Sequence, residues 1–223
     1  MTNQWLPEGY EPPSAGGIYF KPQIGENRVR ILGDFLNPHT AIMGYIGWTT
    51  NLDGERKPVR GNMNHFYEVK EKGDDDPKHF WNLTVWDYSA NAVKVWEITQ
   101  STIQQAITDL SKKESWGDPR YYDISITRKG EKLDTTYNII PENPKGDPAK
   151  EVIDAAKEAS IDLRELFKGG VPFGVDKSQI EKNDKLDLLG KSPVIFDAVA
   201  ENTESLGDMS KDEPEEKLDD LPY

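Results

Sequence analysis

Large aromatic rings recur along one segment of the chain, residues 80–88, which has the alternating pattern of a β-strand. Alternation puts an apolar set on one face: Trp81, Leu83 and Val85. The other face carries polar groups and two large rings: Asn82, Thr84, Trp86 and Tyr88. Exposed rings stack on unpaired bases, and each stacked base contributes about 1–3 kcal/mol to binding. This face therefore predicts a surface for single-stranded nucleic acid.

A second strand, residues 93–98, follows across a Ser-Ala-Asn-Ala turn and makes a hairpin with the first. With Val93 and Val95 facing the core, Lys94 and Trp96 would point outward beside Trp86. Arg28 and Arg30 alternate with apolar residues in the segment 28–32 and are expected on the same outer surface. A cationic groove of this kind would hold the phosphates.

Two further basic segments would flank this surface. One is the loop with Arg56, Lys57 and Arg60, and the other is the turn with Arg128, Lys129 and Lys132. The complete predicted binding set is Arg28, Arg30, Arg56, Lys57, Arg60, Trp86, Tyr88, Lys94, Trp96, Arg128 and Lys129. The alternative to a binding role is, for each ring, packing in the core or at the rim of the core. For each cation, the alternative is an ordinary surface position without a role in binding.

The elements that must position these residues are mainly strands. Strands are expected at 28–32, 45–50, 66–70, 80–88, 93–98, 121–128 and 135–140, with a loop at 51–60. Ser101 is expected to cap a helix over 102–113, because Ile103, Ile107 and Leu110 recur at helical spacing. This order predicts a mainly β fold, an OB-fold five-stranded Greek-key barrel with a helix between strands 3 and 4.

Composition divides the chain into four predicted regions. Residues 1–17 are rich in Pro and Gly and form an N-terminal arm, and residues 18–147 form the OB-fold domain. Residues 148–200 form a helical extension, in which one or two helices over 148–167 pack outside the barrel and end at Gly169 and Gly170. Residues 201–223 form a disordered acidic tail.

The tail holds nine acidic residues against two lysines, which is more than half of the net charge of −13. Without the tail, the remaining charge leaves room for a local basic surface. The chain ends on a possible partner-binding segment: Asp219, Asp220, Leu221, Pro222 and Tyr223. One apolar ring beside a carboxylate offers a partner protein a pocket filler and a charge. The alternative is a tail that serves only solubility.

Several function classes lack support in the residues. The chain has no Cys, and His39, His65 and His79 show no ligand spacing, so neither a disulfide framework nor a metal site is expected. No phosphate-binding glycine loop or nucleophile motif is present, so we expect no cofactor and no enzyme activity. No signal peptide or stretch of about 20 apolar residues occurs, which predicts a cytoplasmic protein without membrane contact.

Five strings in the chain resemble tailed-phage single-stranded DNA-binding proteins of OB fold over about residues 18–144. They are Arg-Val-Arg-Ile-Leu-Gly, Pro-Lys-His-Phe-Trp-Asn-Leu-Thr-Val-Trp-Asp-Tyr, Val-Trp-Glu-Ile-Thr, Trp-Gly-Asp-Pro-Arg-Tyr-Tyr-Asp-Ile-Ser-Ile-Thr-Arg-Lys-Gly and Thr-Thr-Tyr-Asn-Ile-Ile-Pro. The last five residues are similar to the Asp-Asp-Ile-Pro-Phe tip of bacterial single-stranded DNA-binding proteins, which recruits replication and repair proteins. The resemblance implies a phage replication or recombination role in the cytoplasm of a bacterial host. The zinc site of some phage relatives does not carry over, because this chain has no Cys.

The leading hypothesis is a sequence-tolerant coat for single-stranded DNA, with a tail that recruits polymerase, helicase, recombinase or nuclease partners. An acidic protein that binds other proteins, such as a DNA mimic, is the main alternative. It would show no affinity for oligo(dT). A metal-dependent nuclease using Asp74, Asp75 and Asp76 or the tail carboxylates is a third reading, and it would degrade the oligonucleotide when magnesium is present.

Overall fold

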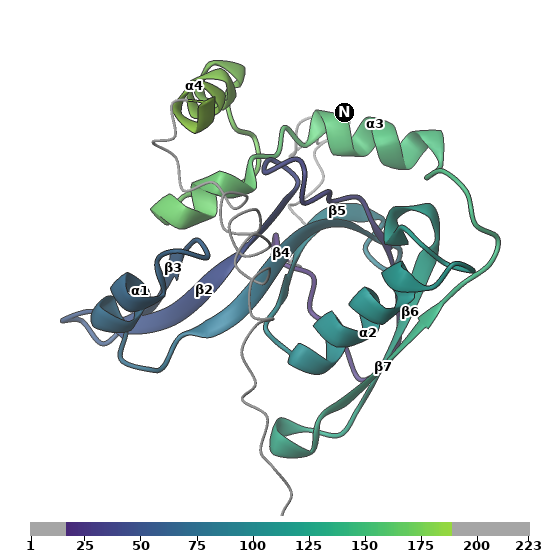
Figure 1. The fold of residues 1–223 in the computed structure, drawn as a ribbon, viewed down its shortest axis with the longest axis horizontal. Coiled ribbons are helices and arrows are strands. Elements are labelled where there is room, and N and C mark those ends of the chain that lie inside the picture. The colour runs from purple at the N-terminus through teal and green to yellow at the C-terminus, as the bar shows by residue number, and fades with distance from the viewer. Residues whose placement is uncertain (1–16, 189–223) are drawn as a thin grey trace, which may run out of the picture.

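Seven antiparallel strands form one sheet within residues 17–188, the part of the chain that the structure, a computed structural model, describes (Figure 1). The strands are β1 (Gly25–Ile31), β2 (Ala41–Thr50), β3 (Arg56–Gly61), β4 (Lys78–Asp87), β5 (Ala92–Ile98), β6 (Asp123–Lys129) and β7 (Thr136–Pro141). They follow the order β3-β2-β4-β1-β6-β7, and β5 pairs with β4. Residue Leu83 of the central strand β4 faces Ala41 of β2 across one edge and Trp96 of β5 across the other.

The sheet is not closed. Strands β5 and β7 would have to pair to complete a five-stranded barrel, and no such pairing occurs among the described strands. The mainly β class predicted from the sequence is therefore confirmed, whereas the closed OB-fold barrel is not.

Helices lie on both faces of the sheet. They are α1 (Phe66–Lys72), α2 (Ser101–Lys112), α3 (Lys150–Glu158) and α4 (Lys177–Leu188), with short 3-10 helices η1 (Pro119–Tyr121), η2 (Lys132–Asp134) and η3 (Leu163–Lys168). Helix α2 matches its predicted position, although Gln100 rather than Ser101 is its N-cap residue. The predicted apolar face of α2 is confirmed, because Ile103, Ile107 and Leu110 are buried.

One core, here called the inner core, lies between the sheet and α2. Its buried members are Phe20, Val29, Ile31, Ala41, Leu83, Val85, Trp96, Ile98, Ile103, Ile107, Leu110, Tyr122, Ile124 and Ile126. In Figure 1, α2 runs between the β4–β5 and β6–β7 ribbons. The inner core therefore joins the two halves of the sheet.

A second core, here called the outer core, lies on the other face of the sheet. Its buried members are Ile42, Ile46, Phe80, Val95, Ile161, Leu163 and Leu166. Ile161 lies between α3 and η3, and Leu163 and Leu166 belong to η3, so the C-terminal extension covers this face. Helix α3 contacts β5, and η3 contacts β2 and β3 (Figure 1). The predicted packing of C-terminal helices outside the sheet occurs, while α4 was not expected as a separate helix.

Two predicted elements are wrong. The segment 66–70, expected as a strand, belongs to helix α1, and the loop expected at 51–60 contains strand β3. Helix α1 packs closely on the β2–β3 hairpin because Gly47 and Gly61 have no side chains. A Cβ atom on Gly61 would lie 2.8 Å from Cγ2 of Val69, the buried residue of α1. This tertiary contact, rather than local alternation, decides the conformation of the segment.

Some predictions fall outside the described residues. The N-terminal arm lies almost wholly there, and the acidic tail with Asp219, Asp220, Leu221, Pro222 and Tyr223 lies there entirely. The four-region division therefore stays a prediction. Within residues 17–188, no helix is both long and apolar enough to cross a membrane.

Candidate nucleic-acid interface

Trp96, predicted to stand outward as a stacking ring, belongs to the inner core. Its side chain is only 1% exposed and meets Phe20 edge-on, with ring centroids 5.6 Å apart. The reason is the register of the hairpin, which pairs Trp96 with Leu83 and Val95 with Thr84. Cross-strand partners share a face, so Trp96 follows Leu83 into the core. The predicted inside and outside of β5 were therefore interchanged.

Trp86 does lie on the opposite face of β4, but the prediction that it is exposed is also wrong. It pairs with Arg30 of β1 and Val93 of β5 and is 7% exposed. On the same face, Asn82 and Thr84 are fully buried, and the Asn82 Oδ1 and Thr84 Oγ1 atoms have no hydrogen-bond partner among residues 17–188. The polar face predicted from the sequence exists, but the protein covers it.

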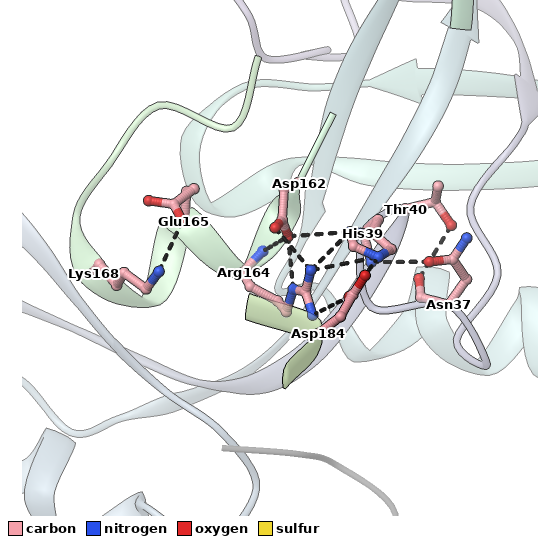
Figure 2. Close-up of polar contacts among 8 residues, drawn as sticks. All are labelled: Asn37, His39, Thr40, Asp162, Arg164, Glu165, Lys168 and Asp184. Carbon is pink, nitrogen blue, oxygen red and sulfur yellow. Dashed lines mark hydrogen bonds and ion pairs between the residues drawn. The ribbon is translucent and has the colours of Figure 1, made fainter. Parts of the chain in front are cut away.

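The cover is held by a buried ionic group at Arg164 (Figure 2). The guanidinium donates to both carboxylate oxygens of Asp162, at 2.8 and 2.9 Å, and its side chain is 6% exposed. It also contacts His39 Nδ1 at 2.8 Å and Asp184 Oδ1 at 3.0 Å. The backbone N–H of Leu163 donates to the His39 carbonyl at 3.0 Å. These bonds tie η3 and α4 to the loop before β2.

Arg30 is a structural cation rather than a surface one. Its side chain is 8% exposed, forms an ion pair with Asp123 and donates to the Gly146 carbonyl at 2.8 Å. A phosphate could reach it only by displacing a buried carboxylate, which would leave that carboxylate without its charge partner. The expectation that Arg30 points outward beside Arg28 is therefore wrong.

Arg60 and Lys94 are also shielded by acidic partners. Arg60 is 6% exposed in its side chain and bonds Glu97 at 2.8 Å. Lys94 is 13% exposed and lies 3.2 Å from Asp87. Burial raises the pKa of Asp87, but hydrogen bonds from Ser89 and Lys94 outweigh it and hold the pKa below its usual value. Both cations thus serve the packing of the sheet.

Arg28 and Tyr88 remain at the surface as predicted. The Arg28 guanidinium lies 4.6 Å from the centroid of the Tyr88 ring, and Tyr88 is 39% exposed. Arg28 donates to Asp123 at 2.9 Å and pairs with Glu142 at 2.9 Å. Partial burial lowers the pKa of Arg28, but the bond to Asp123 and the nearby carboxylates raise it overall. Burial and the bond donated to Asp123 raise the pKa of Tyr88.

The remaining predicted cations lie at the surface or near it. Arg56 and Lys57 are exposed on β3, where they pair with Asp75 and Glu55. Arg128 is half-buried and donates to the Pro22 carbonyl at 3.0 Å, whereas its Nε atom is buried and has no hydrogen-bond partner in the described part of the chain. Lys129, at the end of β6, is exposed. Contact of any of these residues with DNA stays a prediction.

The sequence reasoning missed Trp48, which is 38% exposed near the end of β2. It pairs with Pro58 of β3, and the Arg56 guanidinium lies 5.5 Å from the centroid of its ring. Beside it is a hollow of about 470 Å³ whose lining includes Trp48, Arg56, Asp75, Asp76, Lys78 and Thr99. The sequence contained a signal for this residue. Trp48 follows Ile46 by two positions, so strand alternation puts both on the same face, and β2 continues past the part of the strand that packs in the core.

Carboxylates of the 74–76 loop, considered as metal ligands, bond to protein groups instead. Asp74 accepts from Thr50 Oγ1 at 2.8 Å, Asp75 pairs with Arg56, and Asp76 lies 3.4 Å from Lys70. In the described part of the chain, no group of three or more acidic or His side chains could hold a metal ion.

Comparison with known proteins finds one similarity of interest. Over 144 residues the chain is 31% identical to a protein of Escherichia phage T5 that is named as a probable ssDNA-binding protein. The alignment takes in 54% of this chain and 53% of the phage protein, so the chain spans about half the length of that relative. No family model matches the chain. No solved structure matches it.

Proposed function

We propose that this protein binds single-stranded DNA without sequence preference and takes no part in catalysis. The observation that carries the proposal is the similarity to the probable ssDNA-binding protein of phage T5. Two exposed ring and guanidinium pairs support it, Trp48 with Arg56 and Tyr88 with Arg28. Rings of this kind stack on bases of any sequence, and the guanidinium groups reach the backbone phosphates.

We also infer that the strands form an open variant of the OB fold. The order β5-β4-β1-β6-β7, with α2 in the connection from β5 to β6, supports this inference. The fold includes an added element, the β2–β3 hairpin with α1, between β1 and β4. OB folds bind oligonucleotides over a sheet face and its flanking loops. Here the C-terminal extension covers part of the corresponding face, so the added hairpin and the Arg28–Tyr88 edge are the surfaces open to DNA.

Oligo(dT) binding tests the proposal. Fluorescence anisotropy of labelled oligo(dT) should rise on adding the protein and should fall again as salt increases, because each phosphate contact releases counterions. For a single strand the slope of log K against log salt is about −0.7 per phosphate. Absence of binding at low salt would refute the function and favour the DNA-mimic alternative. Shortening of the oligonucleotide in magnesium would favour the nuclease.

The biological setting is part of the proposal. We propose that the protein coats single-stranded DNA during phage replication or recombination in the cytoplasm of a bacterial host, and that residues 219–223 recruit replication enzymes. The full chain and a chain ending before Asp219 should therefore retain different proteins from a bacterial lysate. Retention of the same set by both chains would contradict the role of the tip.

A further inference from the structure

We propose that the β2–β3 hairpin carries a stacking subsite for one base of single-stranded DNA, and that Asp75 occupies the phosphate position of this subsite in the free protein. The ribbon subsite comprises Trp48, Arg56, Lys78 and the hollow beside them. The inference rests on the proposed function and adds to it a specific site and a built-in competitor.

Trp48 provides the stacking surface. At 38% exposure it is the most exposed indole in residues 17–188, where Trp86 and Trp96 are 7% and 1% exposed. The position of the ring is restricted, because Trp48 pairs with Pro58 in the β2–β3 ladder and the Arg56 guanidinium lies over the ring. A ring ordered in advance loses little side-chain freedom when a base stacks on it.

Arg56 provides the charge for the phosphate. Its guanidinium lies beside the indole and pairs with Asp75, and both side chains of this pair are 56% exposed. An ion pair with that exposure is weak, because water and salt screen it. A phosphate oxygen is an equally good or better acceptor for a guanidinium. DNA can therefore replace the carboxylate without exposing or burying a new charge.

The position of Asp75 is set by the end of β2. The backbone N–H of Asp74 donates to the Trp48 carbonyl at 2.6 Å, and Thr50 Oγ1 donates to the Asp74 side chain at 2.8 Å. These two bonds hold the 74–76 loop against the strand that carries the ring. Asp75 is thereby placed next to Arg56, where a backbone phosphate would lie beside a stacked base.

The hollow between the hairpin and this loop has room for a nucleotide. Its volume of about 470 Å³ lies within the range of small-ligand sites. Lys78 lines it and forms no ion pair in the described part of the chain, whereas Glu97 in the same wall bonds Arg60. Lys78 can therefore bind a second phosphate without first breaking an ion pair with a carboxylate.

Substitutions in the full chain test the two halves of the proposal in opposite directions. Trp48→Ala should weaken oligo(dT) binding by between about 5-fold and 150-fold, the range for loss of one stacked base. Tyr67→Ala is the matched control, because Tyr67 is 80% exposed on the neighbouring α1 and no cation lies over its ring in the described structure. It should leave the affinity unchanged.

Asp75→Asn should tighten binding by at least about twofold at low salt, and the gain should disappear in an Arg56→Ala background. Asp53→Asn removes the same charge from the exposed turn of the hairpin and should have a smaller effect. Equal gains from the two substitutions would overturn the role of Asp75, because they would reflect net charge alone.

Trp48→Phe is the control for misfolding of Trp48→Ala. The Phe ring should retain most of the affinity, while the quenching of Trp fluorescence by oligo(dT) should lose its largest component. If the wild-type chain binds DNA and Trp48→Ala, Trp48→Phe and Tyr67→Ala all match it in affinity and quenching, the ribbon subsite is wrong and the function stands. If the wild-type chain does not bind, both proposals are wrong.

Discussion

Replacing Arg164 by Met should destabilise the protein strongly, because the guanidinium neutralises a carboxylate that cannot reach water. Asp162 is 0% exposed and Arg164 is 6% exposed in their side chains. Removing one partner of a buried ion pair costs about 3–5 kcal/mol, since the other charge stays buried. We therefore expect the free energy of unfolding to fall by about 3–5 kcal/mol.

Lys168→Met is the matched control from the same 3-10 helix. Lys168 pairs with Glu165 at 2.8 Å, but its side chain is 48% exposed (Figure 2). An exposed pair of this kind contributes about 0–1 kcal/mol. Removal of a cation from η3 should thus have very different effects at two positions four residues apart.

Urea unfolding measures the difference. With an m value of about 2 kcal/mol/M, a loss of about 3 kcal/mol lowers the midpoint by about 1.5 M. The double variant Asp162→Asn with Arg164→Met should be more stable than Arg164→Met alone, because it removes the buried carboxylate charge that has lost its guanidinium partner. A midpoint for Arg164→Met within about 0.5 M of that for Lys168→Met would refute the reasoning.

The same variant separates two possible DNA surfaces. Loosening the extension would expose Asn82 and Thr84 on the covered face of β4. If DNA used that face, Arg164→Met would increase the affinity for oligo(dT). The side chains of the ribbon subsite on β2 and β3, Trp48 and Arg56, are already exposed, so the affinity should remain unchanged.

Three further predictions concern charge, acid stability and packing. Deleting the chain after residue 200 should tighten oligo(dT) binding at low salt, because the acidic tail competes for the same cations; equal affinity with and without it would refute the competition. The hydrogen bond from Arg120 lowers the pKa of Asp118 below 3.8, so its stabilisation is present above that pH and is lost as the pH falls through the folded-state value. Acid titration of Asp118→Asn should accordingly show a smaller loss of stability than the wild-type chain. Gly61→Ala would place a Cβ 2.8 Å from Cγ2 of Val69 in α1 and should cost about 1–3 kcal/mol in urea unfolding, whereas Gly146→Ala has open space and should change little.

Elements with one buried face were predictable from the residues alone. Helix α2 was found because Ile103, Ile107 and Leu110 recur on one side of it and polar residues occupy the other. The β4–β5 and β6–β7 pairs were found because a turn separates two runs of β-forming residues. In each of these cases the information lies within about 20 neighbouring residues.

The orientation of β5 was not predictable in this way. Trp96 faces the inner core and Val95 faces the outer core, so both faces of the strand are buried. A strand with two buried faces is apolar on both sides and loses the alternation that marks inside from outside. The register with Leu83 and Thr84 decided the matter.

The local chemistry of the chain was therefore determined by the sequence: where rings, cations and turns occur, and that the fold is mainly β. Which rings remain accessible was decided by tertiary structure, because Trp96 packs into the inner core, and Leu163 and Leu166 cover the other sheet face, which is formed some 80 residues earlier. The pairing of Arg56 with Asp75 likewise joins residues 19 positions apart. Exposure and charge pairing depend on segments distant in the chain, and a pattern read along neighbouring residues does not contain them.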